Sequence, residues 1–453
     1  MSTTGVGGSI LSGSEATSSS GGLGSGIDVS GLVAAAMADQ TAELQLMQGQ
    51  QTTLTTEQTS LTSFNTDVQT LQSAVFALTD PAGALTDVVA TSSDPDSFTA
   101  SAISGVTSGT HTVTVANLAT TSSAYSTPVT AATIPNGSLS IQVGTNTAVP
   151  ITINSTDNTL AGLAQAINNT NNIGVTASVI TDANGSRLAI VSNSSGLPGT
   201  LTITPSAGEP TFTTSGGTNA NLTIDGVPIA STTNTVAGVL PGITLNLTGP
   251  SSGPVSLTTG PDVTSQAAAL NSFVTAYNTV IGDLNTQFAV SATTNEPGPL
   301  ASDSTLSLAQ GQLLSSVSFS MTGNGAVQSL ADLGITMADD GTLSVDSSTL
   351  AATLQTNPSA VSSFFQGTGT GSFGANLDSV LSTLADPVSG AITQDINGLA
   401  QTQTSLTQQI ADFQTQMASQ SAALTTQYDT VDTTLQELPL LLQQVTQQLQ
   451  SLG

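Results

Sequence analysis

The segment ITQDINGLAQTQTSLTQQIADFQTQMASQSAALTTQYDTVDTTLQEL, residues 392–438, repeats apolar side chains mostly at alternating steps of four and three. This spacing forms a heptad-like seam, typical of a helix that packs along another helix. The residues between are mostly Gln, Thr, Ser and Ala, and a lone helix so rich in Thr and Ser is weakly stable in water. A packing partner is therefore expected. The predicted seam residues are Ile392, Ile396, Leu399, Leu406, Ile410, Phe413, Met417, Leu424, Tyr428, Val431 and Leu435.

A second heptad seam lies near the other end of the chain, in MQGQQTTLTTEQTSLTSFNTDVQTLQSAVFAL, residues 47–78. It stops at Asp80-Pro81, because the residue before a proline disfavours helical geometry. Pairing the two seams would contribute about 1.5–3 kcal/mol for each large apolar side chain buried. Parts of both segments fit equally well as core helices of one bundle. The second set of predicted packing residues is Met47, Leu54, Leu61, Phe64, Val68, Leu71, Val75 and Leu78.

The charge balance excludes several classes of partner. The 453 residues include 29 Asp and Glu but a single Lys or Arg, so the chain cannot neutralise phosphates. We expect no nucleic-acid binding and no binding to anionic membranes. No cysteine is present, which removes disulfides and thiolate chemistry. The first 26 residues lack a basic segment and no long apolar run follows, so neither a cleaved secretion signal nor membrane insertion is expected.

The apolar pattern of the sequence changes from helical periodicity to strand-like alternation and back to helical periodicity, which predicts an α+β fold. Alternating apolar strands are bounded by Asn136-Gly137, Asn184-Gly185, Asp225-Gly226 and Pro241-Gly242, which are typical of hairpin turns. The expected domain order has terminal coiled-coil helices, a helical bundle domain and a β-rich double-domain insertion. Its parts are a disordered segment at 1–42, a heptad helix at 43–87, β-rich domains at 88–260 with a helix at 159–168, the second half of the helical domain at 261–366, a glycine-containing joint at 367–390 and a coiled-coil leg at 391–453.

Several stretches, in this order, resemble the flagellar filament-capping protein family, also called hook-associated protein 2. They are GSGIDVSGLV at 24–33, TLAGLAQAIN at 159–168, FVTAYN at 273–278, SLADLGI at 329–335 and DGTLSVD at 340–346. Each stretch alone is a weak signal, but their order over nearly the whole chain is specific.

The resemblance implies that both termini form the part that inserts into the filament, with the β-rich domains inserted into a helical domain. It further implies a homo-oligomeric ring of about five subunits at the filament tip, outside the cell. The ring would guide flagellin subunits into place and prevent their loss. Export through the flagellar channel without a cleaved signal, and a cytoplasmic export chaperone, are also implied.

Two features depart from the family pattern. Pro439 is expected to break the last helix near Glu437, with a short amphipathic helix after it. The near absence of cations leaves the helix register to packing alone, because no ion pair of Lys or Arg with Glu can form between the helices. The glycine-rich stretch from Gly367 to Gly374 is expected to let the terminal and inserted parts move relative to each other.

The inventory for catalysis is nearly empty, so no catalytic, cofactor or metal site is predicted. His111 lies in an alternating strand without a second metal ligand or catalytic partner, and Arg187 follows a turn where Asp182 offers an ion pair. Asp339-Asp340-Gly341 is better explained as a hairpin turn than as a calcium site.

Two alternative functions remain open at this point. One is another axial subunit of the flagellum, either a junction protein or a flagellin-like protein. The other is a secreted adhesin. A glycan-binding face normally uses exposed aromatic rings, and residues 88–260 contain only Phe98, Tyr125 and Phe212.

Overall fold

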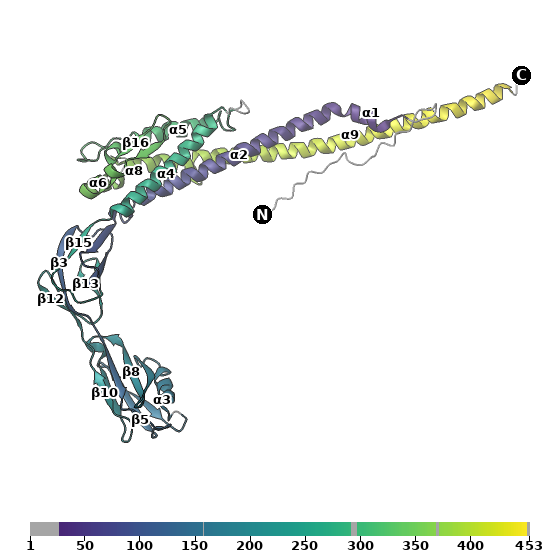
Figure 1. Ribbon diagram of the computed structural model, residues 1–453. Coiled ribbons are helices and arrows are strands. Elements are labelled where there is room, and N and C mark those ends of the chain that lie inside the picture. The colour runs from purple at the N-terminus through teal and green to yellow at the C-terminus, as the bar shows by residue number, and fades with distance from the viewer. Residues whose placement is uncertain (1–26, 157, 291–296, 368–370, 451–453) are drawn as a thin grey trace. The chain divides into compact units, whose positions relative to one another are not determined.

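The computed structural model describes residues 27–156, 158–290, 297–367 and 371–450 (Figure 1). The chain divides into two compact units, each taken by itself. Unit 1 comprises Met1–Thr66, Thr286–Leu306 and Leu384–Gly453, and unit 2 comprises Asp67–Asn285 and Ser307–Thr383. Helices and several β-sheets occur in the same chain, so the predicted α+β class is confirmed.

Unit 1 is built from terminal helices. They are α1 (Val29–Ala36), the first part of α2 (Ala38–Thr79) and α9 (Ala391–Gln450). Helices α2 and α9 lie side by side (Figure 1). They run antiparallel, because the hydrogen-bonded residues on α9 decrease in number as those on α2 increase.

The predicted disorder up to residue 42 does not hold for residues 29–36 and 38–42, which are helical. Asp28 caps α1, because its Oδ1 accepts a hydrogen bond from Gly31 N at 2.9 Å. Val33 and Met37 are buried, and α1 contacts α9. Packing on α9 therefore supplies the stabilisation that this short Ala-rich segment lacks alone. Residues 1–26 of the predicted disordered segment lie outside the described residues.

The break predicted at Pro439 is also wrong, because α9 continues through it to Gln450. The side chains beside it, Leu438 and Leu440, are exposed, so the surrounding backbone faces water. A carbonyl freed by the missing N–H can be hydrated there, and the flanking Leu and Gln residues are good helix formers. The proline therefore does not end the helix.

The helical part of unit 2 surrounds a core of aromatic and aliphatic side chains. Phe364 stacks on Phe373 with ring centroids 5.2 Å apart, and Phe373 also meets Phe273 edge-on at 5.8 Å. The elements are the second part of α2, α4 (Val263–Phe288), α5 (Ser304–Val317), η3 (Leu330–Leu333), β16 (Ile335–Met337), β17 (Leu343–Val345), α6 (Ser347–Thr356), α7 (Pro358–Gln366) and α8 (Phe373–Ala385), preceded by η1 (Ala84–Thr86).

The described part of the predicted glycine joint is packed and mostly helical, and the motion expected of it stays a prediction. Helix α8 fills residues 373–385, and Ser372 and Phe373 are buried. A Cβ on Gly374 would collide with the carbonyl oxygen of Phe365, so this glycine allows close packing of α8 on α7. Residues 368–370 lie outside the described part of the chain.

The first β region combines a five-stranded sheet, in the order β1-β15-β3-β11-β12, with a three-stranded sheet, β13-β14-β2. Their facing side chains form one hydrophobic cluster that includes Phe98, Val113 and Leu257. All six pairings are antiparallel, and two of them, β11 with β12 and β13 with β14, are hairpins closed by short turns. The strands are β1 (Val88–Ser92), β2 (Phe98–Ala102), β3 (Gly109–Asn117), β11 (Ala220–Ile224), β12 (Val227–Ser231), β13 (Thr235–Leu240), β14 (Ile243–Leu247) and β15 (Val255–Pro261).

The second β region has a separate core under helix α3 (Leu160–Asn168). Thr159 Oγ1 caps this helix by accepting a hydrogen bond from Gly162 N at 3.0 Å, and Leu163 and Ile167 join the core. The sheets run β10-β4-β8-β7 and β6-β5-β9. Their elements are β4 (Thr121–Ser126), β5 (Gly137–Val143), β6 (Val149–Ile153), β7 (Val175–Asp182), β8 (Gly185–Ser195), η2 (Leu197–Gly199), β9 (Leu201–Pro205) and β10 (Phe212–Ser215).

Three of the four predicted hairpin turns are confirmed. Asn184-Gly185 joins β7 to β8, Asp225-Gly226 joins β11 to β12, and Pro241-Gly242 joins β13 to β14. Asn136-Gly137 is not a hairpin, since β5 pairs with β6 and β9 and not with the preceding strand β4.

Candidate assembly surface of the terminal helices

Neutral hydrogen bonds cross the pair of helices α2 and α9. They join amide side chains to hydroxyl or amide groups at 2.7–2.8 Å, without any ion pair. From the sequence, we expected apolar packing alone to determine the register of the two helices. These polar contacts were not predicted. Gln and Thr at facing heptad flanks are the signal that could have revealed them. The bonded pairs are Gln40 with Gln420, Gln51 with Thr407, and Thr55 with Gln403.

The predicted seam residues of unit 1 fall into three groups by burial. Leu61, Phe64, Ile392 and Ile410 are buried. Exposed positions are Val431 and Leu435, at the far end of α9. Half-buried positions are Met47, Leu54, Ile396, Leu399, Leu406, Phe413, Met417, Leu424 and Tyr428. The seam is therefore only partly covered within one chain.

The remaining four predicted seam residues lie in unit 2. Val68, Leu71, Val75 and Leu78 are all fully buried in a single chain. They are core residues of the helical domain, which agrees with the alternative interpretation of this part of the seam as a bundle helix.

A groove of about 900 Å³ opens on the paired helices of unit 1. Gly49 lies on its wall, and a Cβ at this position would point into open space. Leu46 is 59% exposed on its wall. The lining is entirely uncharged and consists of Gln45, Leu46, Gly49, Gln50, Thr53 and Leu54 on α2 with Gln401, Thr402, Ser405, Leu406 and Gln409 on α9.

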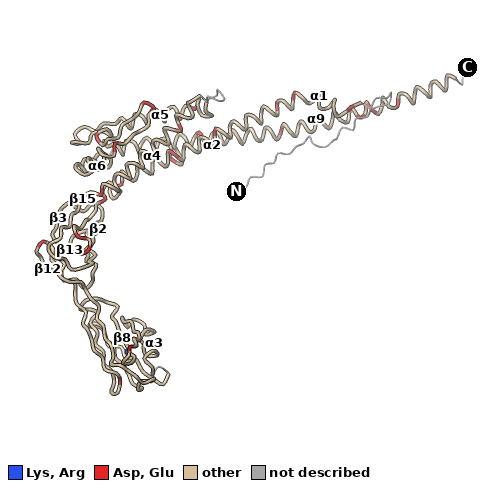
Figure 2. The backbone as a smooth tube through the Cα atoms, viewed as in Figure 1, with Lys and Arg blue, Asp and Glu red and all other residues tan. Residues whose placement is uncertain are grey.

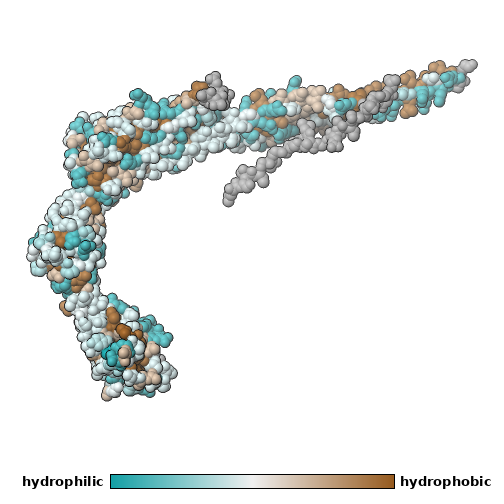
Figure 3. All heavy atoms as spheres, in the orientation of Figure 1, coloured by the Kyte–Doolittle hydropathy of each residue, from teal (hydrophilic) through white to brown (hydrophobic). Residues whose placement is uncertain are grey.

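The last turns of α9 expose a second apolar surface. Figure 3 shows brown, apolar side chains along this end of the helix, where no other described element covers them. Six large side chains are between 45% and 66% exposed: Leu438, Leu440, Leu441, Leu442, Val445 and Leu449. Apolar surface of this extent on a helix normally indicates a packing partner.

Charge is sparse on both units. Figure 2 shows short red acidic segments separated by long tan stretches. No helix contains Lys, Arg or His, because the only arginine and the only histidine lie in strands. Any helix that binds the groove or the end of α9 therefore meets neutral amides, hydroxyls and methyl groups, not a pattern of charges.

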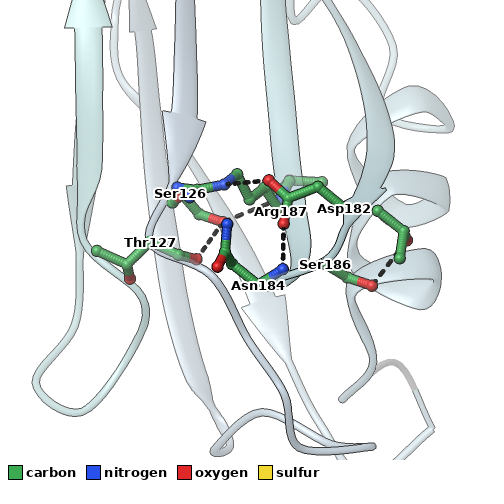
Figure 4. Close-up of polar contacts among 8 residues, drawn as sticks. Ser126, Thr127, Asp182, Asn184, Ser186 and Arg187 are labelled. Carbon is green, nitrogen blue, oxygen red and sulfur yellow. Dashed lines mark hydrogen bonds and ion pairs between the residues drawn. The ribbon is translucent and has the colours of Figure 1, made fainter.

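The single arginine is held by its own domain, as Figure 4 shows. Arg187 Nε lies 3.7 Å from Asp182 Oδ2, so the predicted ion pair is confirmed. Its Nη1 donates to the carbonyl oxygen of Ser126 at 3.3 Å, and its guanidinium lies 5.8 Å from the ring centre of Tyr125. These contacts hold the side chain on the sheet surface.

The single histidine has an ordinary role in the sheet, as predicted. His111 Nδ1 lies 2.7 Å from Asp225 Oδ2, and Thr112 N donates to Asp225 Oδ1 at 2.8 Å. These hydrogen bonds from His111 and Thr112 lower the pKa of Asp225. The carboxylate thus holds the turn between β11 and β12 against β3.

Two further features, a metal-binding cluster and a helix able to span a membrane, are absent from the described residues. Within them, no three His, Cys, Asp or Glu side chains gather as a metal site would require. None of the described helices is long and apolar enough to cross a bilayer.

Paired terminal helices that are nearly uncharged and only partly covered, with β domains inserted between them, are typical of a structural subunit of a larger assembly. Two family models match the chain: Flagellar hook-associated protein 2 N-terminus over residues 25–122, and Flagellar hook-associated protein 2 C-terminus over residues 217–439. The chain belongs to the flagellar hook-associated protein 2 family. This family is one of structural flagellar proteins, not of enzymes.

Individual relatives agree with this assignment. Flagellar hook-associated protein 2 of Escherichia coli O157:H7 is 30% identical over 96% of this chain and 99% of its own length. The B-type flagellar hook-associated protein 2 of Pseudomonas aeruginosa is 28% identical over 78% of this chain and 81% of its own. The crystal structure of the D1-D2-D3 domains of the Escherichia coli flagellar cap protein has a TM-score of 0.59 and 28% identity, covering 75% of this chain and 99% of that one.

Proposed function

We propose that this chain caps the distal end of the bacterial flagellar filament as a homo-oligomer. The cap lets flagellin subunits insert beneath it and prevents their loss. Family membership over nearly the full length supports this proposal, and so does the likeness to a solved flagellar cap protein.

The uncharged groove on α2 and α9 is the main structural support for this proposal, and it identifies the residues that would contact a neighbouring subunit. Half-buried seam residues such as Leu54 and Leu406 line the groove. A neighbouring helix that entered it would bury these side chains, at about 25 cal/mol for each Å² of apolar surface removed from water. The occupant in our proposal is a terminal helix of a neighbouring filament or cap subunit.

A low charge suits an anchor that must be released and remade as the filament grows. No ion pair can fix the position of a helix that docks in this uncharged groove, so registers that bury similar apolar surface differ little in energy. The anchor can then hold the cap while it shifts between binding positions.

Further features of the cap follow from the resemblance described above and belong to the same proposal. The ring contains about five subunits, related by closed rotational symmetry. The chain is exported through the flagellar channel without cleavage of a signal, with a dedicated chaperone in the cytoplasm. The lack of cysteine is compatible with passage between compartments of different redox state.

A pair of matched variants tests the groove. Leu46→Glu places a charge on the groove wall, whereas Gln48→Glu places the same charge on an exposed position of α2 outside the groove. Each variant is expressed in a strain that lacks the native gene. We expect Leu46→Glu to release flagellin monomers into the medium and shorten the filaments, while Gln48→Glu restores normal filaments.

Two results would contradict the proposal. Normal filaments in the strain that lacks the gene would show that the chain is no cap. Labelled protein along the filament or beneath it, and absent from the tip in electron micrographs, would favour a different axial subunit. Equal behaviour of the two variants would exclude the groove while leaving the capping function intact.

A further inference from the structure

Two neighbouring segments of chain join the β insertion to the helical part of unit 2. The chain leaves η1 and enters β1 at Val88, and it returns from β15 at Pro261 into α4. Val88 pairs with Pro261 in the antiparallel ladder, and Asp262 N donates to the carbonyl oxygen of Asp87 at 2.9 Å. The two segments, residues 85–88 and 261–266, are called the junction below. A junction of this kind bends as a hinge unless further contacts prevent it.

A buried amide spans the junction. Gln266, near the start of α4, is 2% exposed. Its Nε2 group donates to the carbonyl oxygens of Leu85 and Asp87, both at 3.2 Å, so both protons of the amide group are used. Because the side chain is buried, water cannot readily replace either bond, and breaking them is costly. Helix α4 is therefore attached to the outgoing segment at two points beyond the ladder of β1 and β15.

The carboxylate of Asp87 connects the two sides of the junction. Its Oδ2 accepts a hydrogen bond from the hydroxyl of Ser265 on α4 at 2.9 Å, and its Oδ1 accepts one from the hydroxyl of Ser104, after β2, at 2.9 Å. The segment after β2 is tied to the junction once more, because Gly105 N donates to the carbonyl oxygen of Thr86 at 3.1 Å. One side chain thus links a helix of the helical part to a loop of the first β region.

We propose that Asp87 and Gln266 lock this junction, so that the helical part of unit 2 holds the first β region in one orientation. Hinges in proteins are a few residues that can absorb large changes in φ and ψ. At this junction the side chains of both residues bridge the outgoing and returning segments, so a change of angle would break several of their hydrogen bonds together. Asp87 and Gln266 are positioning residues. The proposal concerns one chain, so it stands or falls independently of the capping function.

Distances between two spin labels measure the orientation directly. The chain has no cysteine, so two introduced cysteines would carry the only labels. Thr275 on α4 and Val227 on β12 are exposed and suit this purpose. The labelled full-length protein is diluted with unlabelled protein, so that pulsed electron resonance records distances within one chain. We expect a single narrow distance distribution, which becomes broader or displaced in Gln266→Met and in Asp87→Ala.

Two matched controls accompany these variants. Asp96→Ala removes the same charge from an exposed position between β1 and β2, and Thr264→Val changes an exposed side chain at the start of α4. Both controls should retain the narrow distribution. Amide exchange gives a second readout: the N–H of Asp262 should exchange about tenfold faster in Gln266→Met than in Thr264→Val, because a buried hydrogen-bonding group has been lost beside it.

Urea denaturation of the same variants separates positioning from folding. A variant that remains folded at the labelling temperature and still shows a broadened distribution supports the lock. If Gln266→Met fails to fold, Asp87→Ala and Ser265→Ala remove half-buried contacts of the same junction and keep the test available. A broad distribution in the protein with the native junction would overturn the proposal, and so would narrow, unshifted distributions in the folded variants.

Discussion

Gln51 on α2 donates a hydrogen bond from Nε2 to Oγ1 of Thr407 on α9, with 2.8 Å between the two atoms. Thr407 in turn donates its hydroxyl proton to the carbonyl oxygen of Gln403, one helical turn earlier. Register between these helices thus depends on neutral groups that are oriented by the helix backbone. A coiled coil without Lys or Arg can be specific where such bonds recur along it.

A double-mutant cycle should detect this bond. Replacing Gln51 and Thr407 by Ala, singly and together, is expected to give a coupling energy of about 0.5 kcal/mol, near the lower limit for a hydrogen bond because both groups are exposed. The measurement is the free energy of local opening of α9 from amide exchange. The control cycle pairs Thr407 with the exposed Gln48, and its coupling should be close to zero.

Phe364 should be the most sensitive aromatic residue of the helical domain. It is fully buried and stacks on Phe373 with centroids 5.2 Å apart. Phe364→Ala is expected to lower the free energy of unfolding by about 3–5 kcal/mol, measured by urea denaturation. Phe76→Ala, at a position that is 65% exposed, should change it by less than about 0.5 kcal/mol. Similar losses for both would show that the cluster contributes little.

Replacement of Pro439 by Ala should strengthen the end of α9. Alanine restores an N–H that can donate to the carbonyl oxygen of Leu435, and an interior proline costs a helix about 3 kcal/mol. Short-pulse amide exchange is expected to slow over residues 436–443. The control is Leu440→Ala, which changes a neighbouring side chain and leaves the backbone donors unchanged. Faster exchange in Pro439→Ala would contradict the continuity of the helix.

Asp346 should make the hairpin and helix α6 sensitive to strong acid. Hydrogen bonds from Ser348, chiefly its hydroxyl, and from Thr349 lower the pKa of Asp346 from 3.8 to about 2. The stabilisation it provides is therefore present above pH 3.8 and lost as the pH falls through about 2. Urea midpoints measured from pH 5 to pH 2 should fall further for the wild type than for Asp346→Asn, which retains a neutral cap. Parallel curves would exclude this role.

Elements with strong local signals were predictable from the sequence. Helix α3 combines an apolar face with Thr159 as N-cap, and β16 and β17 flank an Asp-Gly turn, so both follow from local chemistry. The two heptad seams could be recognised because the spacing of their apolar residues is the same whether the helix packs within a domain or against another terminal helix. The ion pair of Arg187 with Asp182 was predictable because Asp182 is the nearest carboxylate to Arg187 in the sequence.

Features that depend on contacts distant in sequence were not predictable. The helix from Val29 is stabilised on α9, about four hundred residues later in the chain, and composition alone indicates disorder there. Gly374 looked like part of a flexible joint, yet its missing side chain lets α8 approach Phe365. Pro439 weakens the helix but does not end it, because the freed carbonyl reaches water and the flanking Leu and Gln residues are good helix formers.

The position of Arg187 also determines how the chain meets digestive enzymes. Trypsin-like proteases cut after Lys or Arg, and this chain offers them one peptide bond, between Arg187 and Leu188. That bond lies in strand β8, which is hydrogen-bonded to β4 on one side and to β7 on the other. A protease needs an extended, unpaired segment, so the bond becomes accessible only when the sheet opens. The folded chain should therefore survive trypsin in surroundings where lysine-rich proteins are rapidly degraded.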